Sequence, residues 1–168
     1  MFIYGPGIVK PRGEVDDLAN VADIAPTLAD LVGAKIPENY EFDGINLIPF
    51  LSGKTDKHRD WVYSYNGEHK MVRTRDVFLD GIGFYWDTRG TLDQEAYKMI
   101  EEDTADPALR NDIAAIKSVL EKYPDAPKSG PMYERYMKEK AGKWELWDKM
   151  RKNILRQYKK TGARHFGL

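Results

Sequence analysis

The stretch that decides the fold is DIAPTLADLVG at residues 23–33. Asp23 has the kind of side chain that accepts hydrogen bonds from the free N–H groups at a helix start. Pro26 falls in the first turn, where its missing N–H costs little. An apolar stripe then runs to Gly33, which suits a left-handed C-cap. The pattern predicts a short amphipathic helix over residues 24–32, with Asp23 as its N-cap.

A second stretch, DGINLIPFLSG at residues 43–53, follows after a short gap. Asp43-Gly44 is a turn dipeptide, and Pro49 has a fixed φ. The segment is therefore predicted to be irregular and packed by apolar anchors, namely Ile45, Leu47, Phe50 and Leu51. Neither stretch carries a reactive group.

The N-terminal residues FIY, at positions 2–4, precede Gly5-Pro6-Gly7. This order predicts a buried strand that ends in a tight turn. This stretch lacks the basic segment and the long apolar run of a signal peptide, so none is predicted. The cellular compartment is therefore not predicted. We expect Met1 to be an internal or truncated start.

Aromatic and β-branched runs occupy residues 61–86 and are separated by Asn66-Gly67 and Asp80-Gly81. Such runs with turn dipeptides between them predict a small antiparallel meander. Apolar spacing over residues 92–120 predicts two helices broken near Asp106-Pro107, and Tyr123-Pro124 is expected to end the second.

The C-terminal region, residues 133–158, has apolar and aromatic residues at three- and four-residue steps. It is predicted to form one helix that packs on the rest of the chain and buries Trp144 and Trp147. From residue 133 onward there are eleven Lys/Arg against four Asp/Glu, and the remaining chain has 15 against 23. A basic tail of this kind can bind nucleic acid or anionic lipid, or dock on an acidic body. We expect docking, with neither a nucleic-acid nor a membrane partner.

The composition is that of a folded chain. Its 168 residues are 42% hydrophobic and 12% aromatic, which argues against disorder and allows a real core. No apolar run approaches the ~20 residues that span a bilayer. The chain contains no cysteine, which excludes disulfides and thiolate chemistry within it.

The two motifs together resemble the C-terminal part of the type I sulfatases, arylsulfatase-like enzymes of the alkaline-phosphatase-like superfamily. In that family a "D-I-x-P-T-L…G" helix precedes a "D-G-x-S-L-x-P-x-L-x-G" loop, and MVRTRD at residues 71–76 resembles a later strand. The resemblance implies an α/β fold, α+β as a fragment. Residues 1–55 would be one strand, a helix and a loop from the end of the central-sheet domain. Residues 56–168 would be a C-terminal subdomain with a small antiparallel sheet and packed helices.

The family's reacting groups are not matched in this sequence. Sulfatases use a formylglycine made from Cys or Ser in "C/S-x-P-S/A-x-R" and a calcium ion held by paired Asp/Asn residues. Ser129-Gly130-Pro131 begins such a motif, but Met132-Tyr133 breaks it. We therefore predict no catalytic residue, no metal ligand and no cofactor in this chain, and calcium only in the complete sulfatase.

His69 and Arg73 are the candidate residues for a substrate rim. They stand near the start of a predicted strand, in a sheet that the resemblance places beside the substrate cleft. Cationic groups there can bind an anionic sugar or a sulfate through charge-assisted hydrogen bonds. The alternative, which we favour, is that they are ordinary polar residues on the solvated face of an antiparallel sheet.

Two functions follow from these patterns. In the first, the chain is the C-terminal part of a sulfuric ester hydrolase and is inactive alone. Its partner would be the N-terminal sulfatase portion, and a sulfated small molecule or glycan would bind only to the complete enzyme. In the second, it is a free-standing binding or scaffold module that uses its basic aromatic C-terminal helix. We favour the first, because an independent module does not ordinarily begin inside a hydrophobic strand.

Overall fold

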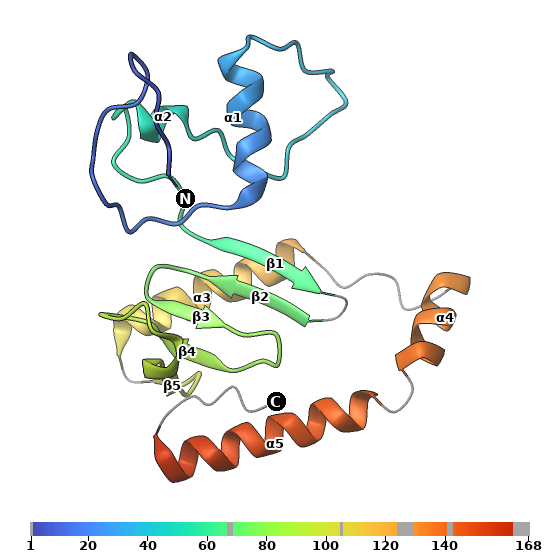
Figure 1. The fold of residues 1–168 in the computed structure, drawn as a ribbon. Helices are drawn as coiled ribbons and strands as arrows, with labels where there is room; N and C mark the ends of the chain where they lie inside the picture. Colours follow the sequence, from blue (N-terminus) through green and yellow to red (C-terminus); the bar gives the residue numbers. More distant parts are fainter. Residues whose placement is uncertain (1, 67–68, 105, 124–129, 141–142, 163–168) are drawn as a thin grey trace. The chain divides into compact units, whose positions relative to one another are not determined.

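The computed structural model separates into two compact units, Met1–Val62 and Tyr63–Leu168 (Figure 1). Each unit has its own secondary structure. The structure describes residues 2–66, 69–104, 106–123, 130–140 and 143–162. None of the helices in these ranges is long and apolar enough to cross a membrane.

The first unit is built around a 3-10 turn, η1 (Val21–Asp23), which continues into α1 (Ile24–Leu31). Asn20 caps the turn, since its side chain accepts a hydrogen bond from Ala22 N. The helix predicted over residues 24–32 is confirmed to within one residue. Gly33 follows it with a φ of 62°, the left-handed conformation that glycine adopts most readily.

The second motif contains a short helix, α2 (Ile48–Leu51). The Thr27 hydroxyl accepts a hydrogen bond from Leu47 N at 2.8 Å, and this joins the two motifs. Leu47 and Phe50 are buried as predicted, whereas Ile45 is exposed.

Gly44 lies against the backbone of η1. A Cβ atom at this position would stand 2.0 Å from the carbonyl oxygen of Ala22 and 2.6 Å from Asp23 N. No side chain fits that space without moving the backbone, so only glycine allows the two motifs to approach this closely.

The strand predicted at residues 2–4 is absent from this structure. The backbone there is not paired with any strand of the described residues, and the Phe2 and Tyr4 side chains are largely exposed. A strand is stable when a neighbouring strand satisfies its N–H and C=O groups, and the described part of the first unit provides none. The predicted strand is therefore not formed in this structure, and the assignment of residues 1–55 to the end of a large central sheet stays a prediction.

The second unit contains a five-stranded antiparallel sheet in the order β1-β2-β3-β4-β5. The strands are β1 (Val62–Asn66), β2 (His69–Arg73), β3 (Val77–Leu79), β4 (Tyr85–Asp87) and β5 (Lys98–Ile100). In the register, Val72 pairs with Leu79, and Phe78 pairs with Trp86. The predicted meander is confirmed, and with it the α+β class.

The first of the two helices predicted over residues 92–120 is wrong. A short 3-10 turn, η2 (Gln94–Ala96), leads instead into β5, where Met99 pairs with Trp86 of β4. The free edge of β4 offers hydrogen bonds that a three-residue helical segment cannot match, because helix nucleation is costly. The second helix, α3 (Pro107–Lys122), is confirmed, with the Asp106 carboxylate as its N-cap.

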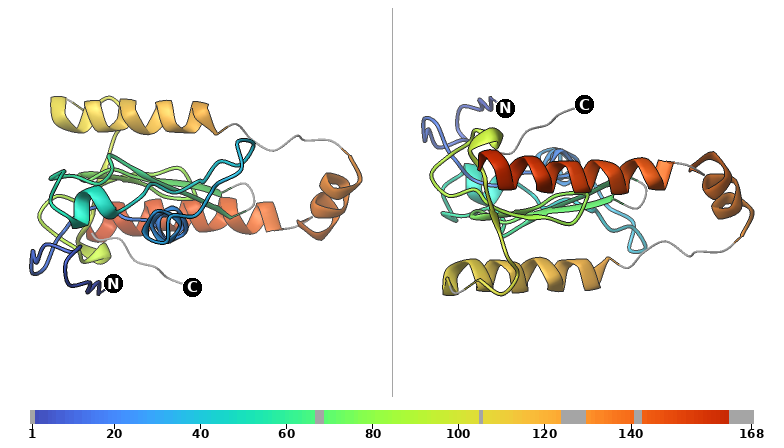
Figure 2. Two further views of the ribbon diagram at one scale, coloured as in Figure 1. Left: turned by 90° about the horizontal axis from the view of Figure 1, so that it is seen from above. Right: turned by 90° about the horizontal axis from the view of Figure 1, so that it is seen from below.

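Two helices cover opposite faces of the sheet (Figure 2). α3 packs on β2 and β3 and buries Leu109, Ile113, Ile116 and Val119. α5 (Lys143–Thr161) packs on the other face, where Ile154, Leu155 and Tyr158 contact a core of Phe84, Trp86 and Tyr97.

The single helix predicted over residues 133–158 is divided in the structure. It forms α4 (Pro131–Lys140) and α5, and residues 141–142 between them lie outside the described part. The prediction rests on apolar spacing alone and takes no account of glycine at position 142, a residue with low helix propensity. The predicted packing face is confirmed for α5, although Trp147 is half-buried where full burial is predicted. The side chain of Trp144 lies outside the described residues.

Candidate functional site

Strand β2 carries both residues predicted from the sequence, His69 and Arg73. Side chains alternate along a strand, so these two and Met71 share the face of the sheet that α5 covers. They stand at opposite ends of the strand, roughly 13 Å apart along its axis. Their side chains contact different groups, the Gly81 carbonyl for His69 and the Tyr97 hydroxyl for Arg73, so the structure does not bring them together into a single anion site.

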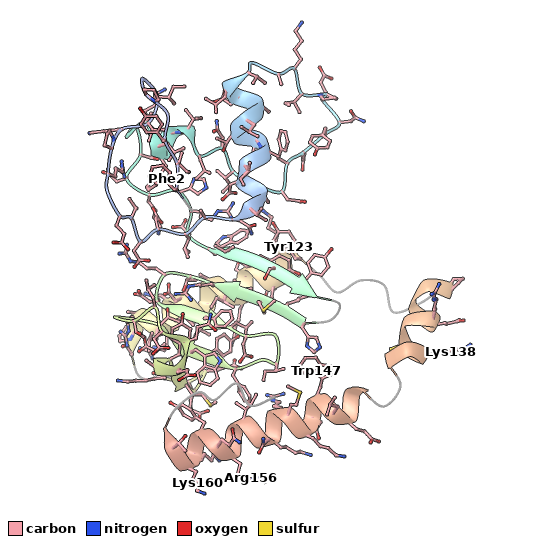
Figure 3. The ribbon with its side chains drawn as sticks, in the orientation of Figure 1. Phe2, Tyr123, Lys138, Trp147, Arg156 and Lys160 are labelled. Carbon is pink, nitrogen blue, oxygen red and sulfur yellow. The ribbon has the colours of Figure 1, made fainter. Side chains whose placement is uncertain are left out.

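His69 joins three elements of the second unit. Its Nδ1 lies 2.7 Å from the carbonyl oxygen of Gly81. A carbonyl only accepts, so Nδ1 carries the proton and donates it. The imidazole also lies 4.2 Å from the Trp147 ring, measured between centroids, and Figure 3 shows Trp147 on the sheet side of α5. His69 therefore acts as a packing contact between β2, the turn before β4 and α5.

Arg73 is tied to the core by a similar contact. Its guanidinium donates a hydrogen bond of 2.7 Å to the hydroxyl of Tyr97, a residue that is almost completely buried. The guanidinium carbon also lies 5.6 Å from the centroid of the Tyr97 ring. The arginine is half-buried, so part of its charge remains available at the surface. Its position supports a structural role in this chain and leaves a substrate role to be tested.

A buried polar group of the first unit is Asp23, the residue that the sequence pattern predicts as a helix cap. Its side chain makes no hydrogen bond to the free N–H groups of α1 and is fully buried, with 0% of the residue exposed. One oxygen, Oδ1, accepts from Ile45 N at 2.8 Å and from the Arg59 guanidinium. The other, Oδ2, accepts from Asn20 N at 2.7 Å and contacts His58 Nε2 at 3.0 Å. Asp23 therefore stands at the N-cap position of α1 as predicted, but the prediction that its side chain caps the helix is wrong.

Burial by itself raises the pKa of the Asp23 carboxyl, because a low-dielectric surrounding disfavours charge. The hydrogen bonds from Ile45, Asn20 and His58, together with the charge of Arg59, outweigh that effect and hold the pKa below its usual value. The carboxylate is therefore charged at neutral pH and fully occupied by donors.

Asp23, with its partners Ile45, His58 and Arg59, forms what we call the Asp23 cluster, and its role is structural. All four hydrogen-bonding positions of the Asp23 carboxylate are used within the unit, and the side chains of His58 and Arg59 are almost completely buried. No position remains for a substrate or a metal ion. In the described part of the chain, no three His, Cys, Asp or Glu residues are grouped so as to hold a metal ion.

No protein-family model matches the chain. Several curated sulfatases do match it. Arylsulfatase A of Bos taurus is 34% identical over 108 residues, which is 62% of this chain and 19% of that protein. Arylsulfatase G of Rattus norvegicus is 30% identical over 125 residues, 71% of this chain and 23% of that protein.

A third relative is the ulvan-active sulfatase of Formosa agariphila, which is 27% identical over 134 residues, 78% of this chain and 24% of that protein. The chain thus spans about a fifth of the length of the curated relatives that it matches. The matches fall mostly in the C-terminal part of these proteins. The chain is therefore related in sequence to the sulfatases and corresponds mostly to their C-terminal part.

Proposed function

We propose that this chain serves as the C-terminal part of a sulfuric ester hydrolase. In this role it completes the fold of the enzyme and shapes the rim of its substrate site, and the reacting groups come from the N-terminal portion. The similarity to several sulfatases supports the reaction class. The substrate of the complete enzyme would be a sulfated small molecule or glycan.

One observation carries the proposal: the exposed apolar face of α1. Val21 is 80% exposed and Leu28 is 55% exposed, although both have large aliphatic side chains. The face they form with their neighbours follows the helical spacing, and its members are Val21, Ile24, Leu28, Leu31 and Val32. A contiguous apolar surface of this kind normally packs against another protein surface.

The Asp23 cluster fixes that face in advance. Through its carboxylate, Asp23 joins the start of α1 to the backbone of Ile45 and to the side chains of His58 and Arg59. A rigid surface binds with less loss of conformational freedom than a mobile one. The first unit is thus suited to dock onto the N-terminal sulfatase portion.

The chain alone is expected to hydrolyse no sulfate ester. Its sequence contains no cysteine and no intact motif for formylglycine. The His58–Asp23 pair of the described residues is buried, so it is not placed to exchange a proton with a substrate. Incubation of the purified chain with a chromogenic aryl sulfate and calcium should give only background release. Calcium-dependent turnover that persists through repeated purification would contradict the proposal.

A second prediction tests the α1 face. The chain would be co-expressed with the N-terminal portion of a sulfatase that has been cut where the match to this chain begins, in a host that makes formylglycine. We expect the two to co-purify and hydrolyse the aryl sulfate. Leu28→Asp should abolish both, because an unpaired carboxylate would be buried in the interface.

Leu92→Asp is the matched control for that variant. Leu92 is 73% exposed and belongs to the second unit, so the same change there should leave association intact. Circular dichroism shows whether both variants keep their fold. Failure of the unaltered chain to associate, or equal association of the two variants, would refute this role.

The contacts of α5 weaken the alternative that the chain is a free-standing scaffold module. It required the aromatic face of the C-terminal helix to meet an external partner. Ile154, Leu155 and Tyr158 instead pack inside the second unit, and the Tyr158 hydroxyl accepts a hydrogen bond of 2.7 Å from Met99 N. Among the side chains of α5 that the structure describes, mainly the polar ones remain for a partner.

A further inference from the structure

The outward face of α5 carries a row of cations. Lys149, Lys152, Arg156, Lys159 and Lys160 are all exposed. They lie opposite the residues that pack on the sheet, and Figure 3 shows Arg156 and Lys160 pointing away from it. Steps of three and four residues place successive members about 5–6 Å apart on one side of the helix.

Little on the helix itself neutralises this row. No Asp or Glu occurs from residue 149 to residue 161. Lys152 forms an ion pair of 2.6 Å with Asp148, at the beginning of the row. Within the part of the chain that the structure describes, Lys149, Arg156, Lys159 and Lys160 make no ion pair.

The helix dipole explains only part of the pattern. Cations in the last turn interact favourably with the negative C-terminal end, which accounts for Lys159 and Lys160. The effect falls off within that turn, so it does not account for Lys149 and Arg156. A regular row of exposed cations, of which only Lys152 makes an ion pair within the described residues, is suited to a linear ligand that carries anionic groups at regular intervals.

We infer that the outward face of α5 binds a sulfated polysaccharide chain through its sulfate groups. The choice of sulfate as the anion rests on the proposed function, and the row of cations is the independent observation. Lysine and arginine both form charge-assisted hydrogen bonds with such oxyanions. Binding by several exposed cations releases counterions, so the affinity should fall steeply as salt rises.

The test compares two triple variants of equal net charge by isothermal titration with a short dextran sulfate. Uncharged dextran of the same length is the ligand control. Arg156→Gln, Lys159→Gln and Lys160→Gln together should weaken binding at least tenfold. They should also reduce the slope of log affinity against log salt by about three, close to one per lost contact.

The control variant, Arg75→Gln with Arg110→Gln and Lys138→Gln, removes three exposed cations elsewhere in the second unit. It should bind nearly as well as the unaltered chain. Equal weakening by both variants would show a general charge effect and overturn the inference. Equally tight binding of duplex DNA, or of vesicles containing anionic lipid, through the same three residues would also overturn it.

The binding measurement can succeed or fail separately from the proposed function. Binding is measured without turnover and without the N-terminal sulfatase portion. A chain that binds dextran sulfate but does not associate with that portion would refute the proposed function alone. A chain that associates but fails to bind would refute only the inference about α5.

Discussion

Asp23→Ala is expected to unfold the first unit, residues 1–62, under conditions in which the second unit remains folded. The substitution removes the carboxylate that pairs with Arg59 and His58, and both of these side chains are almost completely buried. Removing one partner of a buried ion pair costs about 3–5 kcal/mol, because the other charge is left uncompensated. Hydrogen exchange of peptides from the two units, followed by mass spectrometry, separates their stabilities.

Asp16→Ala provides the control. Asp16 is exposed and belongs to the same unit, so its replacement should leave the exchange of residues 1–62 unchanged. Asp23→Asn tests the charge in particular, because it keeps the size of the side chain and loses the pairing with Arg59. Equal protection in the Asp23→Ala and Asp16→Ala variants would show that the cluster does not hold the unit together.

The same carboxylate should make the first unit sensitive to acid. The pKa of Asp23 is lower in the folded chain than in the unfolded one, for the reasons given above. Its contribution to stability is therefore complete above the unfolded pKa of about 4 and is lost as the pH falls through the folded pKa. The protection of residues 1–62, taken relative to the intrinsic exchange rate at each pH, should fall below about pH 4 in the unaltered chain, and Asp23→Asn should flatten this dependence.

Local features of the fold could be predicted from the sequence. The helix at residues 24–31 and the left-handed Gly33 follow from a proline near the start, an apolar stripe and a glycine at the end. The meander follows from β-branched and aromatic runs with turn dipeptides between them. Each of these signals lies within a few residues of the structure that it predicts.

The Asp23 cluster could not be predicted in the same way. Its partners Ile45, His58 and Arg59 are 22 to 36 residues away in sequence. From its position alone, an aspartate before a helix is expected to cap it. The adjacent His58 and Arg59 resemble ordinary surface residues until the fold buries them. Only the tertiary structure distinguishes the two roles.

The contacts of the candidate rim residues, His69 and Arg73, could likewise be predicted only in part. Alternation along a strand predicts that His69 and Arg73 share one face, and β2 confirms that they lie on one strand. The contacts of His69 with Gly81 and of Arg73 with Tyr97 depend on neighbours in the sheet and on the following loop. Whether either residue reaches a substrate depends on the rest of the enzyme and stays a prediction.

The second large effect is expected in the core of the other unit, at Trp86. This residue is 0% exposed, and its ring meets Tyr158 of α5 edge-on at 5.6 Å between centroids. Its indole N–H donates a hydrogen bond of 2.7 Å to Asp80, which also accepts from Phe84 N. Trp86→Ala should lower the free energy of unfolding by about 3–5 kcal/mol, because it leaves a cavity between the sheet and α5.

Trp86→Phe separates the ring from its hydrogen bond. Phenylalanine keeps an aromatic surface against Tyr158 but leaves the Asp80 carboxylate without the indole donor, a loss of about 1–3 kcal/mol. Urea unfolding followed by circular dichroism gives both values, and Leu146→Ala, at an exposed position of α5, serves as the control. If Trp86→Ala were no more harmful than Leu146→Ala, α5 would not be held on the sheet through this core. In that case the direction of its cationic face would no longer be fixed by the packing.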